Sequence, residues 1–285
     1  MNEKLIPRSR DEVPRTEIDP ILSDAATESL KAHLNFRLQV ANEVSRVEGI
    51  PVSLSIQRYT DIYDSLGIGG RMATLPEQIS AKRKQFQDFV DKNIHRPERL
   101  FEYSVEHFLR ERIQKERVRP PERGQFEPFS YEYFSRTKTV RIHFSPRRDI
   151  GQPAVSNDSG PLSSERADVL RQQLTKLFAD VKVTYPEAER VLGLSWLYNL
   201  PAYCRLFPSE YTENKTVVED GYLLQTAAVW GQFMRSDISL NEERARQFLD
   251  NLKKVEKGHV SRALPLKALE VGGNIQSFYK FYGIE

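Results

Sequence analysis

The stretch of sequence that decides the fold is RVLGLSWLYNLPAYCRLFPSEY, residues 190–211. Its first nine residues form a continuous apolar run of strand length, which is typical of a central strand covered on both faces. Pro201 then stands where a short helix can begin, and we expect that helix to run to Phe207. Both tryptophans and the single cysteine lie between Gly193 and Phe233. Because large aromatic side chains bury about 150 to 250 Å² each, this region is predicted to belong mainly to the core.

The residues before this stretch predict a β-hairpin and then a helix. Apolar side chains alternate over residues 129–133 and again over 140–144, with SRTK between the two runs. The other face of the hairpin carries Glu132, Arg141 and His143. Ser163 or Ser164 can cap a helix that ends at Ala179. Its predicted buried stripe consists of Val169, Leu170, Leu174, Leu177 and Phe178.

The residues after the stretch predict one more strand and two more helices. We expect the strand within YLLQTAAVWGQF, residues 222–233. Asn241 can cap an amphipathic helix that extends to Val255. A short helix over IQSFYKFY, residues 275–282, closes the chain.

The amino-terminal half has a helical pattern. Leu30, Leu34, Leu38, Ala41 and Val44 recur at helical spacing between a capping Ser23 or Asp24 and Gly49. Further helices are predicted over about residues 75–94 and 97–117, and a short strand over 50–59.

The predicted fold class is therefore α/β or α+β, with a helical amino-terminal half packed on a mixed-sheet carboxyl-terminal half. Residues 1–22 contain three prolines and no apolar periodicity, which predicts a flexible arm. A turn-rich segment, VRPPERGQFEPF at residues 118–129, favours a boundary there. We expect a helical region over residues 23–125 and an α/β region over residues 126–285.

Composition narrows the classes of function. The 285 residues carry a net charge of +2, with 21 basic and 20 acidic residues on each side of the point after Gln125. This balance argues against a nucleic-acid-binding protein, which normally concentrates basic residues. A single cysteine excludes an internal disulfide, and no Cys/His cluster has metal-ligand spacing. No apolar run is long enough for a signal sequence or a membrane span, so we expect a cytoplasmic protein.

Two groups of polar residues are candidates for a site. On the hairpin, His143 is a candidate proton acceptor and Arg141 a candidate anion ligand, although a solvated strand edge is the simpler interpretation of both. Asn199 and Ser195 stand at the end of the predicted central strand, where α/β folds place ligands. Trp196 and Tyr203 would line the same pocket. The alternative role for Asn199 is to cap the next helix. Cys204 is a candidate nucleophile, but its apolar neighbours favour simple packing in the core.

The order VRIHF, long helix, SWLYN, LFP, WGQF resembles the carboxyl-terminal region of GNAT-like bacterial acyltransferases over about residues 129–271. It also resembles a group of uncharacterised bacterial proteins. The acyltransferase resemblance implies transfer from an acyl thioester such as acyl-CoA, with a base that accepts the proton of the nucleophile. The chain departs from that family because residues 129–285 lack the R/Q-x-x-G-x-G/A phosphate loop, so no catalytic residue is carried over.

The leading functional hypothesis is thus an acyltransferase for a small molecule or amine. His143 and Asn199 would be catalytic, and Arg141, Ser195, Trp196 and Tyr203 would bind substrate. One alternative is a protein without enzymatic activity that binds a partner protein through the arm and the aromatic surface. A third hypothesis is nucleic-acid binding, which requires a local basic patch hidden within the balanced total.

Overall fold

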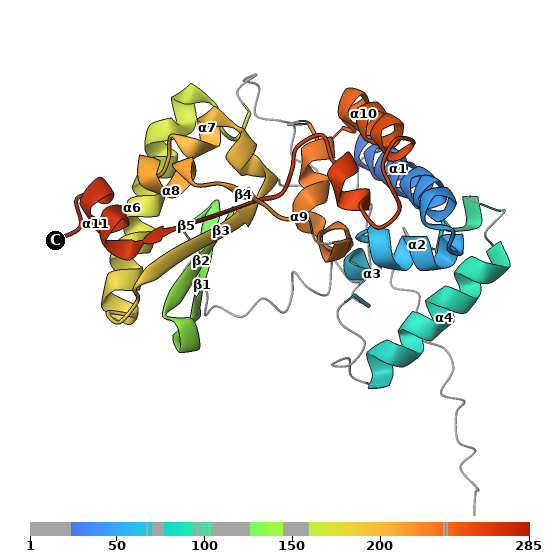
Figure 1. The fold of residues 1–285 in the computed structure, drawn as a ribbon, viewed down its shortest axis with the longest axis horizontal. Coiled ribbons are helices and arrows are strands. Elements are labelled where there is room, and N and C mark those ends of the chain that lie inside the picture. Colours follow the sequence, from blue (N-terminus) through green and yellow to red (C-terminus); the bar gives the residue numbers. More distant parts are fainter. Residues whose placement is uncertain are drawn as a thin grey trace, which may run out of the picture.

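The computed structural model describes most of the two halves of the chain (Figure 1). The described residues are 24–66, 68–69, 77–93, 96, 98–100, 102–103, 126–144, 160–219, 221–235, 237 and 239–285. The predicted arm, Ser23, most of the predicted helix over 97–117, the segment 118–125 and most of the loop before Ser163 lie outside these residues.

The structure confirms a mixed α+β fold with a helical amino-terminal half and a sheet in the carboxyl-terminal half. The first half contains α1 (Asp24–Glu48), α2 (Val52–Tyr59), α3 (Ile62–Ser65) and α4 (Glu77–Asn93). Gly49 ends α1 with a positive φ of 67°, a conformation that suits glycine. The predicted first helix and the predicted helix over 75–94 are therefore confirmed.

The sheet contains five strands in the order β1-β2-β3-β5-β4. They are β1 (Phe129–Phe134), β2 (Thr139–Phe144), β3 (Arg190–Ser195), β4 (Thr216–Val217) and β5 (Leu269–Asn274). β1 and β2 form the predicted antiparallel hairpin, and the central strand β3 runs parallel to β2 and antiparallel to β5. The helices of this half are α6 (Ala167–Thr184), α7 (Pro201–Cys204), α8 (Ser209–Glu213) and α11 (Ile275–Tyr282).

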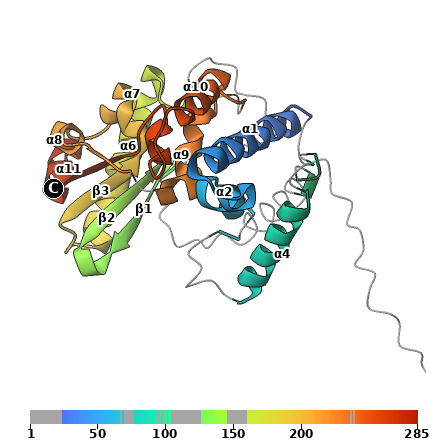
Figure 2. The ribbon, with the colours of Figure 1, turned by 45° about the vertical axis from the view of Figure 1, so that its right-hand side comes forward.

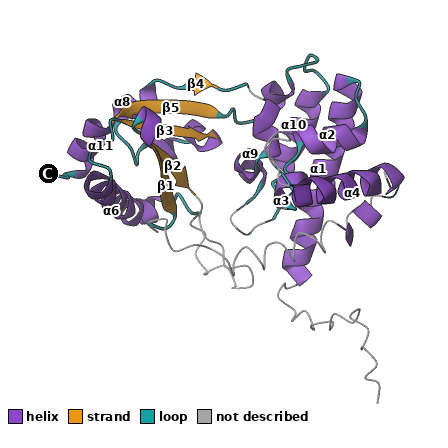
Figure 3. Ribbon diagram, turned by 90° about the horizontal axis from the view of Figure 1, so that it is seen from below, coloured by secondary structure: helices purple, strands orange, loops and turns teal. Residues whose placement is uncertain are grey.

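One face of the sheet is covered by helices, as Figure 3 shows from below. Val140 and Val191 point to this face and join a core cluster with Leu174 and Phe178 of α6 and with Phe278 of α11. The other face carries the alternate residues of each strand. Among its described apolar side chains, only Leu194 belongs to a hydrophobic cluster.

The chain enters the helical half twice. After β4 it forms a 3₁₀ turn (Gly221–Gln225), α9 (Ala227–Trp230), α10 (Glu242–Leu252) and a last 3₁₀ turn (Val260–Ala263), and then it returns to the sheet as β5. Trp230, Phe233 and Phe248 pack against Phe36 of α1 in a shared cluster. Figure 2 shows α1 and α10 side by side. The division of the chain near residue 126 stays a prediction. The structure shows in addition that the described residues of 221–268 lie with the helical half.

A buried ion pair holds the helical half together. Arg37 of α1 donates from Nη2 to Oδ2 of Asp61 at 3.0 Å, and the Asp61 side chain is only 2% exposed. The guanidinium also lies 4.8 Å from the ring centre of Trp230. Because both charges are desolvated, each depends on the other for compensation.

Several sequence-based predictions were wrong. Residues 52–59 form α2 rather than a strand. Its buried residues are Ser53, Ser55 and Ile56, and Ile56 packs in a cluster with Leu34 and Ala41 of α1. Residues 222–233 are helical turns rather than a strand. There the Trp230 Nε1 donates to the Leu224 carbonyl at 2.8 Å and closes the local fold. Val169, expected to be buried, is 52% exposed.

Other elements form where they were predicted, but they begin or end at different residues. The helix expected to end at Ala179 continues to Thr184, and β3 ends at Ser195 rather than at Tyr198. The helix from Pro201 is shorter than predicted and ends at Cys204. The Asn241 cap of α10 is confirmed, since its side chain accepts from the Arg244 N–H at 3.2 Å. The last helix, α11, has the predicted ends.

Four tyrosines fill the core between the sheet and its helices: Tyr198, Tyr203, Tyr211 and Tyr282 are each less than 10% exposed. The Tyr198 and Tyr211 hydroxyls lie 3.0 Å apart, and the Tyr282 hydroxyl donates to the Leu206 carbonyl at 2.7 Å. Burial raises the pKa of each phenol above its usual value of 10.0. These tyrosines therefore make the folded state dependent on pH at the alkaline end.

We expect the free energy of unfolding to be constant with respect to these tyrosines below pH 10 and to fall above it. The unfolded chain loses phenolic protons near pH 10, whereas the folded chain holds them to higher pH, so alkali favours unfolding. Each such group removes up to about 1.4 kcal/mol per pH unit. Urea titrations between pH 8 and 11, together with phenolate absorbance, test this. Complete ionisation of all tyrosines with the fold intact would contradict it.

Candidate functional site

The structure places most of the predicted site residues where β2 and β3 diverge. Both strands have six residues, but they pair with each other only over Thr139–Arg141 and Arg190–Leu192. Beyond these residues, β2 continues to pair with β1, and β3 continues to pair with β5. Among the described residues, the facing backbone edges of Ile142–Phe144 and Gly193–Ser195 therefore have no partner strand.

The carboxyl end of β2 presents an imidazole and a guanidinium on the face without covering helices. His143 Nε2 lies 3.2 Å from Glu132 Oε2 of β1, an ion-pair distance when the imidazole is protonated. Arg141 is the register partner of Glu132, but its guanidinium lies 5.7 Å from the ring centre of Phe134. Within the described part of the chain, Arg141 Nε and His143 Nε2 have no hydrogen-bond partner of good geometry. Both side chains thus point out of the apolar face, as predicted.

The carboxyl end of β3 leads into a 3₁₀ turn, Trp196–Asn199, whose polar groups bind backbone. The Ser195 hydroxyl accepts from the Leu197 N–H at 3.1 Å. Asn199 Nδ2 donates to the carbonyls of Trp196 at 2.6 Å and Lys267 at 2.8 Å. Asn199 therefore ties the end of β3 to the segment that precedes β5.

Trp196 connects the sheet to the helical half. Its indole Nε1 donates to the Ala228 carbonyl at 3.0 Å, and the Arg244 guanidinium lies 6.0 Å from its ring centre. Gly231 packs against the same indole, because a Cβ there would lie 3.6 Å from Nε1. These contacts give Trp196 a structural role at the junction of the two halves.

Tyr203 lies on the opposite side of the sheet from Arg141 and His143. It is 2% exposed, belongs to the core cluster, and its ring lies 5.5 Å from that of Phe144 at the end of β2. The structure thus brings Ser195, Trp196 and Asn199 together at one strand end and Arg141 and His143 at the next. Tyr203 lines the closed, helix-covered side.

Cys204 has partners other than a histidine. Its Sγ lies 3.3 Å from the Tyr198 carbonyl and 3.3 Å from Lys215 Nζ, which itself donates to the Tyr198 carbonyl at 2.6 Å. Cys204 also packs against the core cluster. This agrees with the packing role that the sequence favoured.

Two features of the site escaped sequence reasoning. Glu132 was placed on the polar face of the hairpin, but its approach to His143 depends on the strand register. Lys267 is far from Asn199 in sequence, and no local pattern links them. Burial lowers the pKa of the Lys267 ammonium, which donates to the Leu264 carbonyl at 3.1 Å.

Within the described ranges, no three His, Cys, Asp or Glu side chains gather closely enough to hold a metal ion. The helices described here include none with the length and apolar character needed to cross a membrane. The chain matches no family model, no curated protein and no solved structure with which it was compared.

Proposed function

We propose that this chain transfers an acyl group from a thioester of the coenzyme A class to a small-molecule amine, at the diverging ends of β2 and β3. The observation that carries the proposal is the short pairing of these parallel strands, which ends after three residue pairs. Ligands of α/β proteins bind at the carboxyl ends of strands, where neighbouring elements separate.

The chemistry of the donor fits an unpaired strand edge. The pantetheine arm of coenzyme A is an extended chain with two amide groups, so it can pair with backbone N–H and C=O groups as an added strand does. The free edges of Ile142–Phe144 and Gly193–Ser195 offer such groups on both sides. A thioester held there would lie beside His143, which is on β2 itself.

The transfer step needs one base. The amine nitrogen attacks the thioester carbonyl carbon, the C–N bond forms, the C–S bond breaks, and the thiolate leaves and takes a proton from solvent. His143 accepts the proton that the amine loses. The negative charge of Glu132, whose Oε2 lies 3.2 Å from Nε2, favours the tautomer with hydrogen on Nε2 and thus leaves Nδ1 as the acceptor.

Hydrogen exchange locates the donor directly. With acetyl-CoA bound, we expect slower amide exchange in peptides that contain Ile142–Phe144 and Gly193–Ser195, because their free edges gain hydrogen bonds. Peptides from α1 serve as the internal control, since α1 lies in the other half. Isothermal titration with acetyl-CoA and with adenosine 3′,5′-bisphosphate separates binding of the pantetheine arm from binding of the nucleotide. Absence of binding at millimolar acetyl-CoA, or protection elsewhere only, would refute the proposal.

A further inference from the structure

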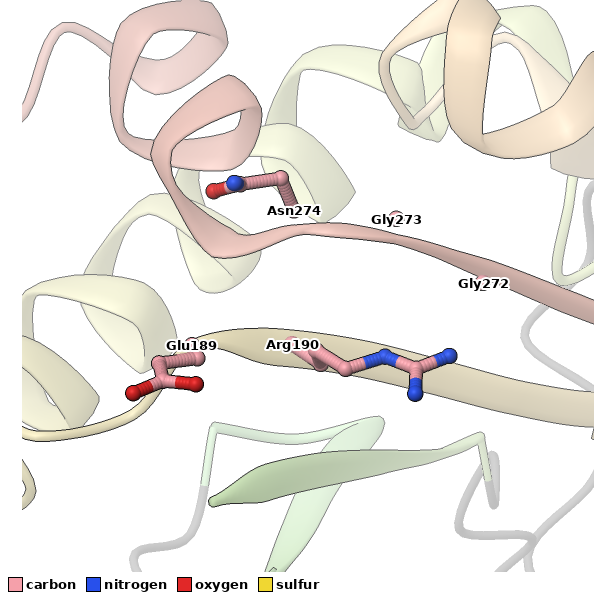
Figure 4. Close-up of a pocket in the computed structure, with 5 residues that line it drawn as sticks. All are labelled: Glu189, Arg190, Gly272, Gly273 and Asn274. Atoms are coloured by element: carbon pink, nitrogen blue, oxygen red, sulfur yellow. The ribbon is translucent and has the colours of Figure 1, made fainter. Parts of the chain in front are cut away.

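Figure 4 shows a depression of about 510 Å³ between β3 and β5. Glu189 and Asn274 point toward one end of it, whereas Arg190 extends along β3 toward the level of Gly272. Glu189 also forms a short ion pair with Lys138, which does not line the depression. The polar side chains around this depression therefore do not meet at one position. Two reactive groups do meet on the helix-covered side of the sheet, at the end of α7.

Cys204, the last residue of α7, has the amino group of Lys215 as a close neighbour. Lys215 lies between α8 and β4, and its Nζ is 3.3 Å from Sγ of Cys204. Both groups also contact the Tyr198 carbonyl oxygen, which is 2.6 Å from Nζ and 3.3 Å from Sγ. This shared acceptor holds the thiol and the ammonium side by side.

The pair can be reached by a small reagent from solvent. Lys215 is exposed, and Cys204 is only half-buried against the core cluster. Packing of Cys204 in the reduced protein is thus compatible with oxidation of its sulfur. The thiolate is the form of cysteine that attacks peroxides, and the ammonium beside it offsets the negative charge that develops as the thiol loses its proton.

The chain has no second thiol for an oxidised Cys204. Because this cysteine is the only one, a sulfenic acid formed on it cannot close an internal disulfide. A sulfenic acid can instead condense with a nearby nitrogen to give a sulfenamide. Lys215 Nζ lies within reach, and its flexible four-carbon stem allows the small approach that an S–N bond requires.

We propose that hydrogen peroxide joins Cys204 to Lys215 through a reversible S–N bond. The Cys204 thiolate attacks one oxygen of hydrogen peroxide, the O–O bond breaks, and the released hydroxide takes a proton to become water. The sulfur loses two electrons in this step and becomes a sulfenic acid. Lys215 Nζ, after losing a proton to solvent, then attacks the sulfur. The S–N bond forms, the S–O bond breaks, and the hydroxide leaves with a proton from Nζ as a second water.

Mass spectrometry of the full chain after peroxide treatment tests this reaction, which does not depend on acyl transfer. We expect a net loss of two hydrogen atoms, about 2 Da, and a joined peptide in which trypsin no longer cuts after Lys215. Dithiothreitol should restore both the mass and the cleavage, because thiols attack oxidised sulfur. The same treatment in urea should oxidise Cys204 without the crosslink, since unfolding separates the two groups. Equal crosslinking of the folded and the unfolded chain would contradict the proposed pair.

Lys215→Arg separates the crosslink from the oxidation of Cys204. Arginine keeps the positive charge, but its guanidinium stays protonated and does not attack sulfur. This variant should accumulate sulfenic acid, which dimedone traps, and form no crosslink. Lys182→Arg makes the same change on α6, where Lys182 lies over the Tyr279 ring, and should crosslink as the unaltered chain does. Identical oxidation products from the unaltered chain and from Lys215→Arg, both folded by circular dichroism, would overturn the proposal.

Discussion

Replacing Gly193 by alanine is expected to lower the free energy of unfolding by about 4 kcal/mol. Gly193 lies in the middle of β3, and its missing side chain is what allows two buried phenols to meet. A Cβ at this position would lie 2.0 Å from the Tyr198 hydroxyl oxygen and 2.4 Å from that of Tyr211. The added methyl group must push apart two hydroxyls that lie 3.0 Å from each other in the core.

Chemical denaturation measures this effect, and Gly272→Ala is its matched control. Gly272 is also a strand glycine next to β3, but a Cβ there has no contact shorter than 3.7 Å. Its replacement should change the free energy of unfolding by less than about 1 kcal/mol. A second control is the double variant Gly193→Ala/Tyr198→Phe. Removal of the hydroxyl nearest to the added methyl group should recover part of the lost free energy of unfolding. A Gly193→Ala variant as stable as Gly272→Ala would show that the tyrosine pair does not require the glycine.

The sequence predicted the elements whose burial follows a local period. β3, the hairpin and α11 have apolar residues at the spacing of their own structure, so a pattern of a few residues identifies them. α2 was misassigned because Val52, Leu54 and Ile56 alternate, while the buried face depends on serines that a hydrophobic pattern ignores. Small polar residues at a helix contact leave no periodic signal.

β5 was missed for a different reason. LEVGGN contains two glycines and only two buried apolar residues, Leu269 and Val271. Gly273 is favoured there by Tyr211 and Phe278, which come within 3.5 Å of its Cβ position. Tyr211 is distant in sequence and Phe278 lies on the next helix, α11, so the reason for the glycine lies in tertiary packing.

The sequence predicted which face of the hairpin carries the candidate site residues, but not which groups those residues contact. Alternation along the hairpin correctly placed Arg141 and His143 outside the core. Polar residues at the end of β3 also occur where expected, but their hydrogen bonds go to backbone carbonyls and N–H groups of the next turn.

Replacing His143 by alanine is expected to lower the kcat of the proposed acyl transfer by about 10² to 10⁴-fold, the usual contribution of a positioned base. The side chain of His143 lies on a regular strand and is 39% exposed, so its removal leaves no core cavity. The dissociation constant for acetyl-CoA should stay unchanged, because the backbone edge that we propose pairs with the donor remains. Glu132→Gln should have a smaller effect, about tenfold, since it changes only the orientation and tautomer of the imidazole.

Added imidazole separates a chemical role of His143 from a structural one. A free imidazole can occupy the space left in His143→Ala and accept the proton, so the rate should rise with imidazole concentration and with no change in stability. His259→Ala, a half-buried histidine of the helical half, should keep full activity and show no such dependence. A His143→Ala variant with an unchanged rate would exclude His143 as the base. Because the divergence of β2 and β3 does not depend on this side chain, the proposed thioester site would then require another proton acceptor on the same sheet face.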